Sequence, residues 1–125
     1  MAAIGMSSLA LVAIGGAAGS VLRYLTSVVA LAWLGPAFPW GTLAVNAAGS
    51  LVIGAMAGAD VEGQARLLLV TGFLGGFTTF SAFSLELVNM INRGAWGQAG
   101  SYIALSLIGG IAGLLAGLAV VRGLA

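Results

Sequence analysis

Four long apolar stretches alternate along the chain with short breaks that contain glycine, proline or charged residues. The stretches cover roughly residues 5–33, 41–59, 65–92 and 98–121. An α-helix needs about 17–25 apolar residues to cross a hydrocarbon core, and each stretch reaches this range. The pattern therefore predicts an all-α membrane protein in which residues 1–125 form a single domain of four transmembrane helices.

The composition agrees with a membrane location. Hydrophobic residues make up 61% of the chain and charged residues 6%, against about 25% charged residues in a typical soluble domain. The chain contains no Lys, His or Cys, so Schiff-base, imidazole and thiol chemistry and Cys/His metal sites have no residues to use. We therefore expect a multi-pass protein of a cell membrane, in bacteria the inner membrane, with no enzyme activity and no nucleic-acid partner.

The positive charges give the predicted helices almost no preferred orientation. Arg66 and Arg122 would lie on one side of the membrane and Arg93 on the other, while Arg23 lies within the first stretch. Positive residues normally mark the cytoplasmic side, so a chain with this balance can insert both ways and form antiparallel dimers. Near balance also arises by chance in a small protein with four arginines, and both interpretations stay open at this point.

Glycine pairs spaced four residues apart recur in the stretches. They are Gly15/Gly19, Gly54/Gly58, Gly72/Gly76, Gly109/Gly113 and Gly113/Gly117. Such pairs let helix backbones approach closely in lipid. Because four short helices enclose little volume, a transport pathway favours an oligomer with some of these pairs at its interface. Tight packing inside one subunit is the alternative.

The segment GGFTTFSAFSLE, residues 75–86, interrupts the third stretch. Counting about 1.5 Å per residue from Ala65, the predicted break at 75–79 lies near the middle of a core about 30 Å thick. A broken helix leaves carbonyls and amides unpaired there. Neutral backbone oxygens from two copies related by a two-fold axis could hold one Na⁺. Alternatively, the Thr78 and Thr79 hydroxyls bond back into the helix and only kink it.

Beyond the break, the helical spacing gathers rings, hydroxyls and a carboxylate. Thr79, Phe83 and Glu86 share one stripe, and Phe80 and Ser84 share the neighbouring one. Such a face favours a protein interior or a pore over lipid contact. Phenyl edges are electropositive, so paired rings beside hydroxyl donors suit a small, compact anion. Ordinary core packing of the two rings is the alternative.

Two other stretches carry uncharged polar side chains one helical turn apart. Asn46 and Ser50 form such a pair in the second stretch, and Tyr102 and Ser106 form one in the fourth, with Gly110 a further turn on. Together with the stripe beyond the break, these donors could replace the hydration shell of a small ion. The usual role of such pairs is interhelical hydrogen bonding, which remains the alternative.

These motifs resemble the signature of the small fluoride channels, the Fluc/CrcB family. The similar segments are GGAAGSVLRY at 15–24, GTLAVNAAGSLVIG at 41–54, GFLGGFTTFSAFSLE at 72–86 and the segment from Tyr102 to Ser106. The resemblance implies a dual-topology antiparallel homodimer of four-helix subunits, with two pores along the interface. It also implies a central structural Na⁺ that is not transported, and passive, selective efflux of fluoride from the cytoplasm.

The resemblance assigns roles to individual residues. Gly75 and Thr78 would give the carbonyls that bind Na⁺, Phe80 and Phe83 would line the fluoride path, and Asn46 matches the pore-lining asparagine. The polar track of the family is matched by Thr79, Ser81, Ser84, Glu86, Tyr102 and Ser106.

Four positions qualify the resemblance. Arg23 matches the family's first-span arginine near the pore vestibule, and Ala82 stands where the family often has Thr. Glu86 would either carry a proton or accept hydrogen bonds that orient the track hydroxyls, and we favour the orienting role. Gly110 offers no hydroxyl one turn beyond the end of the matched track, which is therefore expected to be shorter at that end.

A small multidrug-type exporter is the alternative function. Exporters of this class resemble the chain in length, span count and dual topology, but they exchange protons for bulky cations through a carboxylate in the first span. Here the first span carries Arg23 and no acid, which weighs against the exporter. A purely structural membrane subunit would explain the glycines but not the break combined with hydroxyl stripes.

Overall fold

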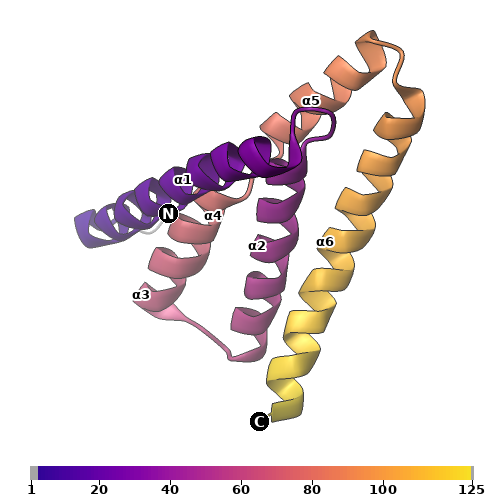
Figure 1. Ribbon diagram of the computed structural model, residues 1–125. Helices are drawn as coiled ribbons and strands as arrows, with labels where there is room; N and C mark the ends of the chain where they lie inside the picture. Colours follow the sequence, from indigo (N-terminus) through magenta and orange to yellow (C-terminus); the bar gives the residue numbers. More distant parts are fainter. Residues whose placement is uncertain (1–2, 125) are drawn as a thin grey trace.

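The computed structural model describes residues 3–124, and all regular structure in that range is helical (Figure 1). The elements in chain order are α1 (Met6–Leu34), α2 (Trp40–Gly58), α3 (Gly63–Arg66), the π-helical segment η1 (Leu67–Leu74), α4 (Gly75–Phe77), α5 (Ser81–Asn92) and α6 (Trp96–Leu124). The elements from α3 to α5 together form the third span, so the described residues contain four spans that are long and apolar enough to cross a membrane. The predicted all-α architecture with an interrupted third helix is confirmed, and the ends of the spans differ from the predicted ones by at most three residues.

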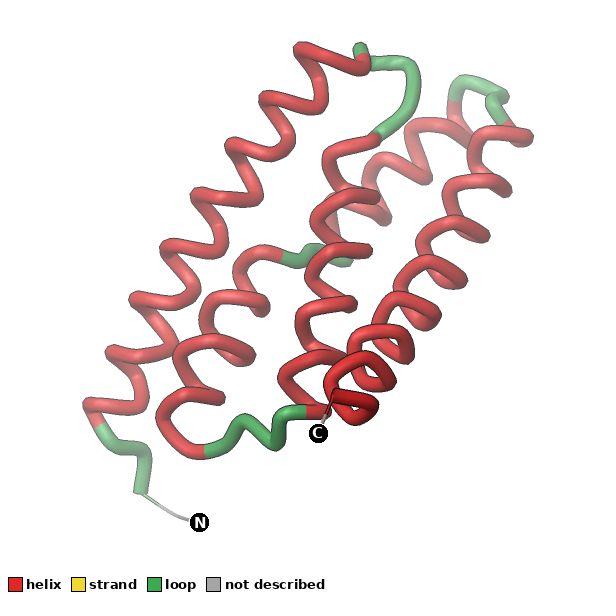
Figure 2. Tube along the Cα trace, turned by 60° about the horizontal axis from the view of Figure 1, so that its bottom comes forward, coloured by secondary structure: helices red, strands yellow, loops and turns green. Residues whose placement is uncertain are grey.

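The interruption of the third span begins later than the sequence predicts. The break predicted at 75–79 is wrong at its start, because Gly75 and Gly76 are helical and α4 ends only at Phe77. The non-helical residues are 78–80, and Thr78 is extended, with φ −85° and ψ 156°. Figure 2 shows this segment as a short piece of loop about halfway along the bundle. Gly76 serves close packing instead, since a Cβ there would collide with the Gly16 carbonyl.

Two glycines of α1 bring this helix into backbone contact with the first half of the third span. A Cβ on Gly15 would collide with the Leu68 carbonyl, and a Cβ on Gly19 would collide with the Phe73 carbonyl. Both carbonyls belong to η1, whose π-helical winding is wider than that of an α-helix. This glycine pair therefore packs helices inside one subunit.

α2 and α6 lie side by side and run in the same direction (Figure 1). A Cβ on Gly54 would collide with the Leu114 carbonyl, and a Cβ on Gly117 would collide with the Leu51 carbonyl. Small residues on both helices thus allow the two backbones to touch over several turns. This contact fixes the register between α2 and α6.

Little of the chain is buried within one subunit. The largest fully buried side chains are Tyr102, Leu74, Met90 and Val45, and Tyr102 and Met90 belong to a small core cluster between α5 and α6. Large apolar side chains cover the outer faces, with Trp33 84% exposed. This surface suits a membrane, because lipid tails are as apolar as the side chains that face them.

Replacing Gly19 by Ala should destabilise the protein. The added methyl group meets the Phe73 carbonyl, so α1 must move away from η1, and overpacking of this kind costs about 1–3 kcal/mol. We expect Gly19→Ala to lower the midpoint temperature of unfolding in detergent. Gly100→Ala is the matched control, because no described atom lies within 4 Å of a Cβ at that position. Equal midpoints for the two variants would contradict the proposed contact.

Candidate functional site

The side chain of Asn46 bridges the interruption in the third span. Its Nδ2 donates a hydrogen bond to the Thr79 carbonyl at 2.9 Å, and its Oδ1 accepts one from the Thr79 amide at 2.8 Å. Both are backbone groups for which a continuous helix would have provided partners. An unpaired backbone group costs several kcal/mol in hydrocarbon. One amide side chain from α2 therefore removes two of the penalties that the break creates.

The hydroxyl of Thr79 pairs an amide in the first turn of the helix that follows the break. Its Oγ1 accepts a hydrogen bond from the Ala82 amide at 3.2 Å, one of the first-turn amides that have no partner within the helix. The Ser84 hydroxyl donates to the Phe80 carbonyl at 3.0 Å. These bonds restart a regular helix within one turn of the break.

The Thr78 hydroxyl bonds back into the preceding helix. Its Oγ1 donates to the Leu74 carbonyl at 2.8 Å, and the Thr78 amide donates to the same oxygen at 3.0 Å. The alternative prediction, in which both threonine hydroxyls bond backward, thus holds for Thr78 and fails for Thr79, whose hydroxyl bonds forward to Ala82.

Two carbonyls at the break lose their usual helical donors. The Thr79 amide, which would bond to Gly75 in a helix, donates to Asn46 instead. The Ala82 amide, which would bond to Thr78, donates to the Thr79 hydroxyl. The oxygens of Gly75 and Thr78 are therefore available to a ligand.

A third carbonyl at the break belongs to Gly76 and has a different partner. The Nε of Arg23 on α1 donates to it at 3.0 Å. Arg23 thus contacts the break from the side of α1. It does not line the groove that lies along α2, α5 and α6. Its guanidinium supplies a charged donor where the helix ends.

A groove of about 460 Å³ lies along α2, the break, α5 and α6. It is lined by Asn46, Ser50, Ile53, Gly75, Thr78, Thr79, Phe80, Phe83, Ser106, Leu107 and Gly110. Nine residues singled out from the sequence are thereby brought together, from positions as far apart as 46 and 110. No charged side chain is among the lining residues.

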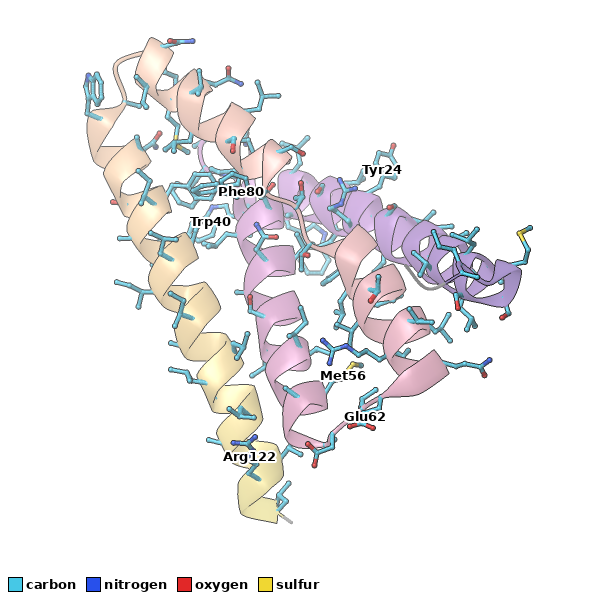
Figure 3. All side chains as sticks on the ribbon, turned by 180° about the vertical axis from the view of Figure 1, so that it is seen from behind. Tyr24, Trp40, Met56, Glu62, Phe80 and Arg122 are labelled. Atoms are coloured by element: carbon cyan, nitrogen blue, oxygen red, sulfur yellow. The ribbon has the colours of Figure 1, made fainter. Side chains whose placement is uncertain are left out.

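The ring of Phe80 is an outward-facing wall of the groove. It is 78% exposed, and Figure 3 shows it beside the interruption between α4 and α5. Its ring centroid lies 5.8 Å from that of Phe83, with the planes tilted by 45°. The two rings are therefore tilted and do not stack face to face.

A second cavity, of about 290 Å³, lies between α1, the connection from α1 to α2, α2 and α5. Thr42 and Glu86 line it, and the Thr42 hydroxyl donates to Glu86 Oε1 at 2.7 Å. Asn89 and Arg93 lie on the same wall as Glu86, one and two helical turns further along. The carboxylate thus faces a cavity that is separate from the groove.

Aromatic rings separate the groove from the second cavity. Tyr102 is completely buried and its ring lies 4.9 Å from Phe83 and 5.4 Å from Phe38. Phe83 lines the groove and Phe38 lines the second cavity. The Tyr102 hydroxyl also donates to Glu86 Oε1, at 3.4 Å. Tyr102 therefore packs against a lining residue of each space and itself lines neither.

Several residues of the predicted track lie away from the groove lining. They are Ser81, Ser84, Glu86 and Tyr102, and Arg23, which was predicted near the pore vestibule, is also absent from the lining. The exposed Ser81 lies close to the groove, with its hydroxyl 3.5 Å from that of Thr79. Thr42 was missed by the sequence reasoning. Its signal was present, because it precedes Asn46 by one helical turn on the same stripe.

Comparison with known proteins assigns the chain to a family. Residues 10–118 match the model of the family described as CrcB-like protein, Camphor Resistance (CrcB). The chain belongs to this family. The match extends across all four spans, and the resemblance seen in the sequence motifs is confirmed.

Individual relatives are similar to the chain over nearly its whole length. The fluoride-specific ion channel FluC of Rhizobium etli (strain CIAT 652) is 54% identical over 120 residues, which cover 92% of this chain and 96% of the relative. The protein of the same name from Agrobacterium fabrum is 52% identical over 126 residues, 95% and 99% of the two chains. The protein of the same name from Novosphingobium aromaticivorans is 48% identical over 126 residues, which cover 96% of this chain and 100% of the relative.

Replacing Asn46 by Leu should destabilise the break. Both backbone groups of Thr79 then lose their partner, at a cost of about 1–3 kcal/mol each. We expect a lower midpoint temperature of unfolding in detergent and faster proteolysis near residue 79. Asn92→Leu serves as the control, since Asn92 is an exposed amide at the end of α5. A variant at position 46 that is as stable as this control would refute the bridging role.

Proposed function

We propose that the chain is a fluoride-selective channel through which fluoride leaves the cytoplasm passively. The observation that carries this proposal is the 54% identity with the fluoride-specific ion channel of Rhizobium etli, matched over 96% of its length. The family match from 10 to 118 includes every residue that lines the groove. A multi-pass location in the bacterial inner membrane follows from the four spans and from the family.

The chemistry of the groove supports a small anion as the transported species. Asn46, Thr79 and Ser106 offer neutral hydrogen-bond donors, and the tilted Phe80 and Phe83 rings offer electropositive edges. Conduction requires that an ion bind well enough to enter and weakly enough to leave. Neutral donors meet this condition better than a fixed positive charge, which would hold the anion in place.

Passive transport suffices for fluoride. Hydrogen fluoride is a weak acid that crosses membranes as a neutral molecule and dissociates at the pH of the cytoplasm, so the anion accumulates inside. A membrane potential that is negative inside then favours exit of the anion by about 2.3 kcal/mol per 100 mV. The pathway therefore needs no energy-coupling group.

The functional unit in this proposal is an antiparallel homodimer. One subunit leaves the groove open and the Phe80 ring 78% exposed at mid-membrane depth. Polar groups without partners are costly against lipid, and a second copy over the groove would cover them and close the pathway. The near balance of Arg66 and Arg122 against Arg93 supports insertion in both orientations.

A structural Na⁺, which is not transported, is proposed at the centre of the dimer. The Gly75 and Thr78 carbonyls fit this ion, because their usual amide donors are engaged by Asn46 and by the Thr79 hydroxyl. No cluster of acidic ligands occurs among residues 3–124, and neutral oxygens are sufficient for a monovalent cation. Two carbonyls from each copy would hold the ion, which would neutralise the facing carbonyl dipoles and tie the two breaks together.

Glu86 acts in this proposal as an acceptor that orients neighbouring hydroxyls. The hydroxyls of Thr42 and Tyr102 both donate to its Oε1. These two hydrogen bonds hold the Glu86 carboxylate in place and in turn fix the orientation of the Thr42 and Tyr102 hydroxyls. A proton-carrying role, as in an exporter, would instead require the carboxylate to be protonated and deprotonated in each transport cycle.

Ion efflux from liposomes that contain the purified protein tests the proposed function. With valinomycin and K⁺ to balance charge, a fluoride electrode should record rapid efflux and a chloride electrode should record none. Efflux of both anions would contradict fluoride selectivity. Silence with both anions, from a protein that is still dimeric in detergent, would contradict the channel and favour a cation exporter that depends on Glu86.

Replacing Glu86 by Gln separates the orienting role from a proton-carrying one. The Gln amide oxygen still accepts the hydrogen bonds from Thr42 and Tyr102, so fluoride efflux should change by less than about tenfold. The measurement is the efflux rate of the variant beside that of wild type, at two pH values. Loss of a proton-coupled flux in Glu86→Gln, with the dimer intact, would overturn the orienting role.

A further inference from the structure

α2 and α6 keep one register along the second half of α2. A Cβ on Gly54 would meet the Leu114 carbonyl and one on Gly58 would meet the Leu118 carbonyl, so these side-chain positions on α2 point at α6 residues sixty positions later in the sequence. The same offset pairs Ser50 with Gly110, whose Cβ would lie 3.6 Å from Ser50 Oγ. Because the two helices run in the same direction, a residue on α2 can be assigned a facing residue on α6 at each turn.

This register aligns two stripes of polar positions as three levels. Thr42 faces Tyr102 at the first level, and both hydroxyls bind Glu86. Asn46 faces Ser106 at the second level, and both line the groove. The levels are about 6 Å apart, since four residues of an α-helix rise by that distance.

The third level differs from the first two, because α6 supplies no side chain there. Gly110 has none, and Ser50 on α2 occupies the facing position; both residues line the groove. The 3.6 Å separation is ordinary van der Waals contact, so the Ser50 hydroxyl lies next to the place where a side chain on residue 110 would begin. The third level therefore carries one hydroxyl, and it comes from the opposite helix.

The hydroxyl of Ser106, which belongs to the second level, indicates that this part of the groove can bind a hydrogen-bond acceptor. Ser106 Oγ is buried and has no hydrogen-bond partner among the described residues. A buried hydroxyl without a partner costs about 1–3 kcal/mol, which an anion or a water in the groove would remove. The Ser50 hydroxyl lies one level further along the groove, where it can donate a hydrogen bond to the same acceptor after that acceptor leaves Ser106.

We propose that Ser50 supplies the fluoride-binding hydroxyl at the third level, in place of the missing side chain of Gly110. This inference rests on the proposed function. The groove then has a hydroxyl or amide at both the second and the third level, and beyond Ser106 the wall that supplies the hydroxyl changes from α6 to α2. The track is thus as long as one with a serine at 110, in contrast to the shorter track expected from the sequence.

The test compares fluoride efflux from liposomes for wild type, S50A, G110S and the double variant S50A/G110S. S50A should slow efflux by about tenfold, the change expected when one hydrogen bond to an ion is lost. The double variant should regain most of the wild-type rate, because a serine at 110 returns a hydroxyl to the same level of the groove. S50C keeps the size of the side chain but replaces the hydroxyl by a weak thiol donor, so its fluoride efflux should also be slower than that of wild type.

Ser101→Ala is the matched control, because Ser101 is an exposed serine on α6 that lines neither cavity. S50A efflux equal to this control would overturn the inference while leaving the fluoride channel standing. Slow efflux in S50A that G110S does not restore would also overturn it, because Ser50 would then act through helix packing. Absence of fluoride efflux from wild type would instead refute the proposed function.

Discussion

The structure depends on one constraint: the third span is interrupted within a membrane-spanning segment, where the free backbone groups need partners from the neighbouring spans. Each such group is costly in hydrocarbon, and the neighbouring spans supply their partners. Asn46 on α2 pairs both backbone groups of Thr79, and Arg23 on α1 pairs the Gly76 carbonyl. Polar side chains that resemble a pore lining therefore have a structural role as well. They make a broken helix possible inside a membrane.

The path along the groove follows from how the break is stabilised. Because Asn46 takes the Thr79 amide and the Thr79 hydroxyl takes the Ala82 amide, the Gly75 and Thr78 carbonyls are left for a ligand. The restarted helix α5 then presents Phe83 to the groove, beside the outward ring of Phe80. Glycine contacts hold the surrounding helices at the distance this geometry needs, through α1 against η1 and α2 against α6. Packing, hydrogen bonding and the proposed conduction thus depend on the same few residues.

The sequence predicted the large features well, since the length and apolarity of a span are properties of local sequence. It misplaced the start of the break, because glycine was taken as a helix breaker at Gly75 and Gly76, whereas Gly76 permits close contact with α1. Contacts between distant segments could not be derived from spacing. The bond from Arg23 to Gly76 joins residues 53 positions apart, and the facing of Ser50 and Gly110 depends on a register set elsewhere on the two helices. The proposed arrangement of two copies depends on contacts that lie outside a single chain.

The most direct test of the whole account is the reversal potential of the current through the protein in a planar bilayer. Fluoride is set at different concentrations on the two sides with chloride equal, first at equal pH and then across a pH gradient. A passive path that binds fluoride with neutral donors predicts a current that reverses at the Nernst potential of fluoride, whatever the pH. A reversal potential at zero, or one that moves with a proton gradient, would contradict the account.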